Sequence, residues 1–152
     1  MIGNLDEMML SSNSKLVCVG KRGSRFAVSE GDDSAEHVTM LACVTTDGRS
    51  MPPFIIFPLT NLPNYSRPTG EKQAGIYIGG QEKGWIDQGT FFEHAKLLVN
   101  FVKGHRHHHG LPEDEPFLLF DESHNSREKP ETMKLLKENN VTPSEKHFLP
   151  TI

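Results

Sequence analysis

Two aspartates in this 152-residue chain stand directly after apolar segments, where the strands of a sheet could bring their carboxylates together. Asp6 follows residues 2–5, and Asp121 follows the continuous apolar run 117–120. If these segments are neighbouring strands of an open α/β sheet, both carboxylates lie where loops gather at the sheet edge. Carboxylate oxygens are hard ligands for Mg²⁺, and close carboxylates repel one another unless a cation lies between them. Either aspartate alone is more typical of a turn or a helix cap, so the metal-site hypothesis depends on their meeting.

A second group of metal-ligand side chains is the histidine-rich segment 105–109. Imidazole nitrogens bind borderline metals such as Zn²⁺. We expect this segment to be a loop, because Gly104 is a suitable residue to end the preceding helix. Adjacent residues of a loop rarely point at one ion, so the sequence favours a solvated loop over a metal site. The histidines concerned are His105, His107, His108 and His109.

The first half of the chain predicts short strands separated by turns. Residues 37–45 are rich in β-branched side chains and predict a buried strand. Asp47-Gly48 follows as a strong hairpin signal, so residues 53–57 are predicted to be the antiparallel partner. The remaining apolar runs are short and bounded by polar, Gly or Pro residues. The strands expected in this half are 16–19, 26–28, 37–45, 53–57 and 75–78.

The second half predicts helix, strand and helix. Thr90 and Glu93 have the spacing of a capping box, so a helix is expected from Thr90 to about Lys103. Residues 117–120 predict a strand buried on both faces. Pro130 at a first-turn position predicts a second helix that ends at the two asparagines 139–140. Side chains expected in the core around the first helix are Trp85, Phe91, Phe92, Ala95, Leu98 and Val102.

Composition places the chain among globular proteins of one domain. Hydrophobic residues make up 36% and charged residues 24%, and no apolar stretch approaches the roughly 20 residues that span a bilayer. The first residues lack the pattern of a secretory signal, and we expect Cys18 and Cys43 to be buried thiols. The net charge of −4 does not favour strong autonomous binding to DNA, because phosphate neutralisation needs a basic surface.

Several segments follow one another in an order that resembles a known family. The resemblance is to the DDE superfamily endonuclease domain of pogo and Tigger type transposases, shared by centromere protein B and the Jerky proteins. It covers nearly all of the chain and implies a ribonuclease H-like fold. That fold is an α/β sheet in which an antiparallel three-strand meander is extended by parallel strands and flanked by helices. The matching segments are 4–7, 21–24, 38–44, Gly48, 52–58, 84–87, Phe91, Phe92 and 117–121.

The resemblance also implies a reaction and a partner. Asp6 would be the first catalytic carboxylate and Asp121 the second, and both would bind Mg²⁺ or Mn²⁺. The reaction would be cleavage and strand transfer at DNA phosphodiesters, and its location would be the nucleus. Glu7 would point to the opposite face of a strand that carries Asp6, so we expect no catalytic role for it. Residues expected near phosphate are His124, Lys21 and Arg22, although an ordinary charged turn explains the two basic residues equally well.

The sequence also departs from this family. After Asp121 the family's histidine-serine-histidine pattern either needs a shift of one residue or has decayed, and no third carboxylate of the family pattern is found before Ile152. We therefore expect residues 1–152 to be a single endonuclease domain, incomplete at both ends, with weak DNA binding and impaired cleavage. Loss of several kcal/mol of charge stabilisation corresponds to about a thousandfold in rate. The alternative is a domesticated, non-catalytic DNA- or protein-interaction module. A homo-oligomer is left open, and no membrane partner is expected.

Overall fold

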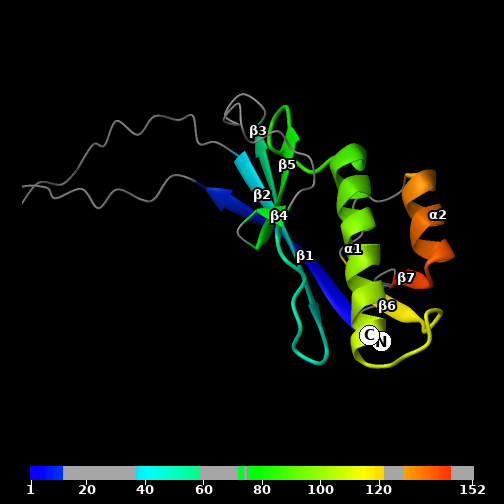
Figure 1. The fold of residues 1–152 in the computed structure, drawn as a ribbon. Helices are drawn as coiled ribbons and strands as arrows, with labels where there is room; N and C mark the ends of the chain where they lie inside the picture. Colours follow the sequence, from blue (N-terminus) through cyan, green and yellow to red (C-terminus); the bar gives the residue numbers. More distant parts are fainter. Residues whose placement is uncertain (12–36, 59–71, 74, 122–128, 145–152) are drawn as a thin grey trace, which may run out of the picture.

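The computed structural model describes residues 1–11, 37–58, 72–73, 75–121 and 129–144 (Figure 1). Within these ranges the chain forms seven strands and two helices. The predicted strands 16–19 and 26–28 lie outside the described residues, as does Cys18. The elements in chain order are β1 (Ile2–Ser11), β2 (His37–Thr45), β3 (Phe54–Pro58), β4 (Lys72–Gln73), β5 (Ile76–Gln81), α1 (Gln88–His108), β6 (Phe117–Phe120), α2 (Pro130–Glu138) and β7 (Val141–Ser144).

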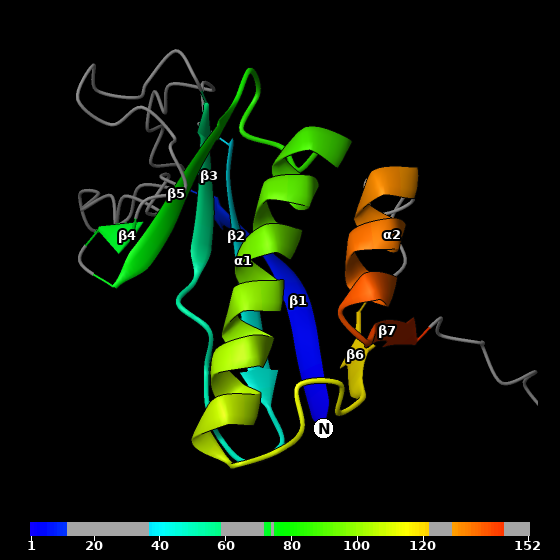
Figure 2. The ribbon, with the colours of Figure 1, turned by 45° about the vertical axis from the view of Figure 1, so that its right-hand side comes forward.

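The strands form one mixed sheet in the order β4-β5-β3-β2-β1-β6-β7 (Figure 2). β1, β2 and β3 make an antiparallel meander, while β6 runs parallel to β1 and β7 runs parallel to β6. β5 adds to the other side as a parallel neighbour of β3, and the two-residue β4 pairs with it. The arrangement of a meander extended by parallel strands is the one predicted.

The β2–β3 hairpin confirms the prediction from Asp47-Gly48. Gly48 has a φ of 84° and donates its amide hydrogen bond to the Thr45 carbonyl at 2.9 Å. β2 covers the predicted residues 37–45, and its alternating burial shows that one face packs in the core. Met51 donates to the Cys43 carbonyl at 2.9 Å, so the chain is still attached to β2 before β3 begins.

The other strands agree with the sequence prediction only in part. β1 continues to Ser11, so Asp6 lies inside a strand instead of after one. β6 was predicted to be buried on both faces, but Phe120 is 40% exposed because helices cover only one side of this strand. β5 confirms the predicted strand near 75–78 and extends to Gln81. The short edge strands β4 and β7 were not predicted.

The start of α1 corrects the predicted capping box. Asp87 is the N-cap and accepts from the Thr90 amide at 2.8 Å, while the Thr90 hydroxyl accepts from the Asp87 amide at 2.9 Å. Thr90 therefore occupies the third helical position of a capping box that begins three residues earlier than expected. Glu93 instead forms an ion pair with Lys96 at 2.7 Å on the exposed surface of the helix.

The end of α1 also corrects the prediction. The helix continues through Gly104 to His108, and Gly110 has a φ of 63°. The amides of Gly110 and Leu111 donate to the carbonyls of His107 and Arg106, at 3.1 and 2.9 Å. This is the pattern of a Schellman motif, in which the residue after the cap adopts the left-handed conformation. The histidine run therefore lies on the last turn of a helix and at its cap, not in a loop.

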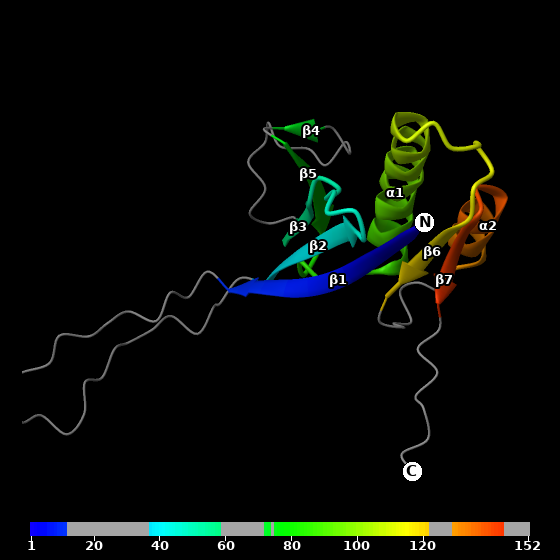
Figure 3. The same ribbon diagram turned by 90° about the horizontal axis from the view of Figure 1, so that it is seen from below.

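The core lies between the sheet and α1, and both helices lie on the same face of the sheet (Figure 3). The predicted apolar stripe is confirmed, since Phe91, Ala95, Leu98 and Val102 are each at most 1% exposed. Trp85 was predicted to anchor the core, but it is 52% exposed and stacks on the His37 ring at 3.9 Å between centroids. Neither α1 nor α2 is long and apolar enough to cross a bilayer.

A buried arginine joins the last turn of α1 to two neighbouring segments of the chain. The Arg106 side chain is 2% exposed, and its Nε donates to the Glu115 carbonyl at 2.9 Å. One terminal nitrogen donates to the carbonyls of Asn139 and Asn140, at 2.9 and 3.4 Å. Burial lowers the pKa of the guanidinium below its usual value. These bonds tie the last turn of α1 to the segment before β6 and to the turn between α2 and β7.

Arg106→Ala should lower the free energy of unfolding by about 2–4 kcal/mol, because buried carbonyls lose their donors. Urea denaturation measures the effect as a shift of the midpoint at constant m value. Lys103→Ala is the matched control, since Lys103 is an exposed cation on the same helix. A loss for Arg106→Ala no larger than that of the control would contradict the assigned role.

Cys43 on β2 gives a second test of the packing. Burial raises the pKa of its thiol to about 11, so alkylation by iodoacetamide near neutral pH should be far slower in the folded chain than in urea. A Cys18→Ser background leaves Cys43 as the single thiol. Because the folded pKa lies above the ordinary value of 9.0, the unfolded thiol ionises first, and stability should fall as the pH rises from 9.0 to about 11. Equal alkylation rates in the folded and unfolded chains would show that the thiol is accessible.

Candidate functional site

The two predicted catalytic aspartates come from neighbouring parallel strands. β1 pairs with β6 in the register Ile2↔Leu118, Gly3↔Leu119 and Asn4↔Phe120. One further step along both strands sets Leu5 beside Asp121, so Asp6 is a single residue away. On regular strand spacing this corresponds to roughly 6 Å between the Cα atoms of the two aspartates.

The surroundings of the two side chains differ. Asp6 is exposed, and its carboxylate accepts a hydrogen bond from the Glu7 amide at 2.9 Å. Because side chains alternate along β1, Asp6 lies on the face opposite to Leu5, which is 1% exposed in the core under α1. Asp121 follows the last residue of β6 and is 7% exposed. The pairing brings the two backbones together. Phe120 shares the open face with Asp6, so continued alternation would direct the buried Asp121 to the core face, and the binding of one cation by both carboxylates stays a prediction.

The chemistry of this pair fits Mg²⁺ in donor type. Both side chains supply carboxylate oxygens, and the exposure of Asp6 leaves space for the waters that Mg²⁺ usually retains. In the described part of the chain, no third His, Cys, Asp or Glu completes a compact ligand group with them. The predicted phosphate contacts His124, Lys21 and Arg22 lie outside the described residues.

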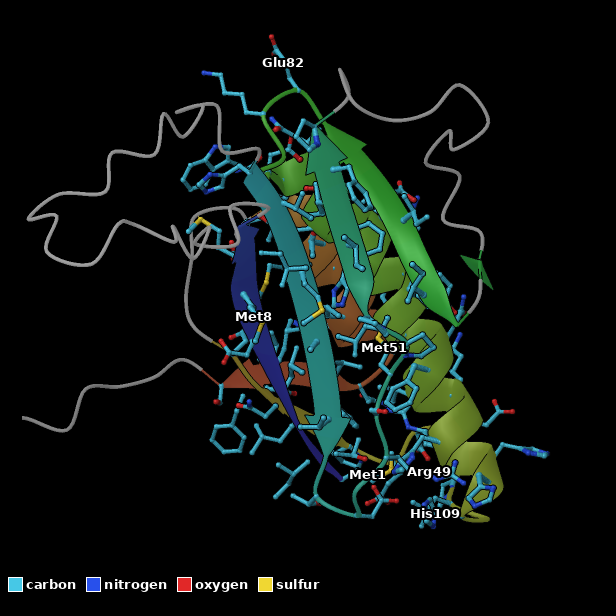
Figure 4. All side chains as sticks on the ribbon, turned by 90° about the vertical axis from the view of Figure 1, so that its left-hand side faces the viewer. Met1, Met8, Arg49, Met51, Glu82 and His109 are labelled. Atoms are coloured by element: carbon cyan, nitrogen blue, oxygen red, sulfur yellow. The ribbon has the colours of Figure 1, made fainter. Side chains whose placement is uncertain are left out.

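A separate cluster joins the end of α1 to the β2–β3 turn. Asp47 Oδ2 lies 2.9 Å from His109 Nε2 and 3.6 Å from His105 Nε2. One ligand atom from each residue lies within 4.8 Å of the other two. His105 and His109 are four residues apart, and continuation of α1 to His108 puts them on one side of the helix. Figure 4 shows Arg49 and His109 at the same end of the sheet as Met1.

The charges within this cluster are set by its neighbours. A hydrogen bond from the Thr45 hydroxyl, together with one from His109, lowers the pKa of Asp47 to about 2. Burial lowers the pKa of His105 below its usual value, which favours the neutral ring. The Arg49 guanidinium lies 2.6 Å from His108 Nε2, so that guanidinium already has a partner.

The spacing of His105 and His109 was a sequence signal for this cluster, but the helix was predicted to end before both residues. Histidines at positions i and i+4 lie together only if the segment is helical. With the helix stopped at Gly104, the spacing of His105 and His109 had no structural meaning. Asp47 was assigned to a turn, and no local pattern indicated that this turn meets the end of α1.

Comparison with known proteins now identifies the family. A family model described as DDE superfamily endonuclease matches residues 34–151. The chain belongs to the DDE superfamily endonucleases. The comparison with curated proteins gives no match. The narrower likeness to pogo, Tigger, centromere protein B and Jerky proteins stays a prediction.

Two solved structures resemble the fold of this DDE domain. A pre-cleavage Mos1 transpososome aligns over 93% of this chain, with a TM-score of 0.57 and 10% identity. A Mos1 transposase paired-end complex with the left transposon end also covers 93%, with a TM-score of 0.52 and 8% identity. The chain spans 35% and 34% of the lengths of these two proteins. The likeness is one of fold, and it confirms the predicted ribonuclease H-like class.

The hydrogen bond that holds Asp47 gives a test by pH titration. Thr45→Val should raise the pKa of Asp47 from about 2 towards its ordinary 3.8, as measured by carboxyl NMR. Because the folded pKa is the lower one, the ionised carboxylate stabilises the fold above pH 3.8, and that contribution is lost as the pH falls towards 2. Thr46→Val is the control, because no hydrogen bond of its hydroxyl to Asp47 is found. An unchanged Asp47 titration in Thr45→Val would contradict the assigned cause.

Proposed function

We propose that this DDE domain acts on DNA as a metal-dependent endonuclease, with Asp6 and Asp121 as the carboxylates that hold Mg²⁺ or Mn²⁺. The parallel pairing of β1 with β6 is the observation that carries the proposal, because its last pair, Asn4↔Phe120, is followed directly by Asp121 along one segment and by Leu5 and Asp6 along the other. Membership of the DDE superfamily endonucleases supports phosphodiester cleavage as the reaction class.

The roles proposed for the side chains follow from their positions. Asp6 offers an accessible carboxylate on the open face of the sheet, and Asp121 offers one from the end of the adjacent strand. Their shared negative charge would hold the cation and fix where the phosphodiester is bound. A bound divalent cation would activate the attacking hydroxyl or water and stabilise the leaving oxygen. With two carboxylates instead of three, we expect weak cation binding and slow cleavage.

DNA is the proposed substrate. The two structural neighbours are a Mos1 transpososome and a Mos1 transposase complex with a transposon end, which supports a DNA partner for this chain. The net charge of −4 means that phosphate neutralisation contributes little, so binding should be weak and its dependence on salt shallow. We propose that His124, Lys21 and Arg22 contact phosphate and that the protein acts in the nucleus. Both proposals rest on the resemblance to pogo and Tigger type transposases.

The test is nicking of supercoiled plasmid with Mg²⁺ or Mn²⁺. Slow, metal-dependent nicking is expected, and Asp6→Asn and Asp121→Asn should each reduce its rate at least about tenfold, because each removes a charged ligand. Mn²⁺ binding, followed by electron paramagnetic resonance, should weaken in the same two variants.

Glu7→Gln is the matched control, because Glu7 adjoins Asp6 in β1 but points to the opposite face. Its rate should equal that of the unchanged chain. Nicking that survives in both aspartate variants, or that is lost equally in Glu7→Gln, would contradict the assignment.

A non-catalytic interaction module is the second candidate, and the open face of the sheet favours it. Apolar side chains surround Asp6 on this face instead of basic ones. Their exposed fractions are 41% for Ile2, 53% for Met8, 49% for Val44 and 40% for Phe120. Such a face suits contact with another macromolecule. Absence of both nicking and Mn²⁺ binding in the folded chain would favour this alternative over the endonuclease.

A further inference from the structure

We propose that Asp47, His105 and His109 form a binding site for a borderline divalent cation of the Zn²⁺ type. Two imidazole nitrogens and one carboxylate oxygen are a donor set that suits Zn²⁺ and related transition metals, whereas Mg²⁺ prefers oxygen alone. Histidines four residues apart on a helix are a recurring way of presenting two such nitrogens to one ion.

The distances are close to those that coordination needs. Ligand atoms about 2.0–2.2 Å from a tetrahedral Zn²⁺ lie roughly 3.4 Å from one another. Asp47 Oδ2 is 3.6 Å from His105 Nε2 and 2.9 Å from His109 Nε2, and the whole set lies within 4.8 Å. His109 and Asp47 have side chains that are 38% and 35% exposed, so small rotations can complete the geometry.

His105 gives an independent reason to expect a ligand. Its side chain is 5% exposed, and its Nδ1 is buried without a hydrogen-bond partner in the described part of the chain. Its Nε2 contact with Asp47, at 3.6 Å, is too long for a hydrogen bond. Nε2 is the nitrogen that faces Asp47, and coordination would replace this long contact with a metal bond. Nδ1 would then carry the proton of the neutral ring.

The site would have an open coordination position. A hollow of about 310 Å³ lies beside the three ligands, and Met1, Ile2, Thr46 and Leu111 also line it. The amino group of Met1 donates to the Pro116 carbonyl at 2.8 Å, so it is already engaged. Water in the hollow is the natural fourth ligand. The cation would also fasten the β2–β3 turn to the end of α1.

This site is separate from the proposed catalytic pair. The Thr46 amide donates to the Ile2 carbonyl at 3.1 Å, which places the turn beside the start of β1. Asp6 is four residues further along this strand, roughly 13 Å away on regular spacing. Substitution at one site should therefore leave the other intact.

The experiment titrates the folded chain with Co²⁺, followed by its visible absorption, and with Zn²⁺, followed by calorimetry. One equivalent should bind, and Zn²⁺ should raise the midpoint of thermal unfolding because it binds the folded state. Asp47→Asn and His109→Gln should each weaken binding at least about tenfold and remove most of that rise. Both replace partly exposed side chains, and circular dichroism checks that the variants fold.

His107→Gln is the matched control, since His107 belongs to the same histidine run but lies outside the cluster. It should bind Co²⁺ as the unchanged chain does. Equal weakening in His107→Gln would show unspecific binding by the run, and absence of Co²⁺ and Zn²⁺ binding would overturn the site. Neither result depends on nuclease activity.

Discussion

The parallel pairing of β1 with β6 is the constraint on which the rest of this fold depends. It joins residues more than a hundred positions apart, so its loop-closure entropy must be offset by packing between the same segments. Gly3 is essential to that packing, because a Cβ there would lie 2.5 Å from Cζ of the buried Phe117 ring. The Leu118 amide also donates to the Met1 carbonyl at 2.8 Å, which fixes the register at the start of β1. A parallel pair needs a long crossover, and α1 supplies its last part, from β5 to β6, while covering the core.

This pairing also determines where each candidate site lies. Asp6 and Asp121 become neighbours because both strands run in the same direction from the same end of the sheet. The end at which both strands start holds the β2–β3 turn, where Asp47 meets the last turn of α1. Arg106 fixes that last turn through carbonyls of two separate segments. The orientation of His105 and His109 therefore depends on the buried Arg106 guanidinium, which belongs to neither site.

Sequence patterns located most elements but misplaced both ends of α1, for identifiable reasons. Thr90 can act as a cap or as the third residue of an earlier box, and only the observed hydrogen bonds with Asp87 decide between them. Gly104 and Gly110 are both suitable terminators, but the positive φ and the closing hydrogen bonds occur at Gly110. The short edge strands β4 and β7 are held by their neighbours, so local propensity could not reveal them.

The position of Asp6 and Asp121 after apolar runs, together with the family resemblance, singled out the acidic pair, whereas the histidine cluster required knowledge of where a helix ends. The difference has a physical basis, because strand neighbours are set by order in the sheet, while i and i+4 neighbours exist only within a helix. The donor chemistry of the two groups also differs. Paired carboxylates select hard cations such as Mg²⁺, and imidazoles with one carboxylate select Zn²⁺ and its relatives. The two proposed sites therefore differ in the class of cation that their donor atoms favour.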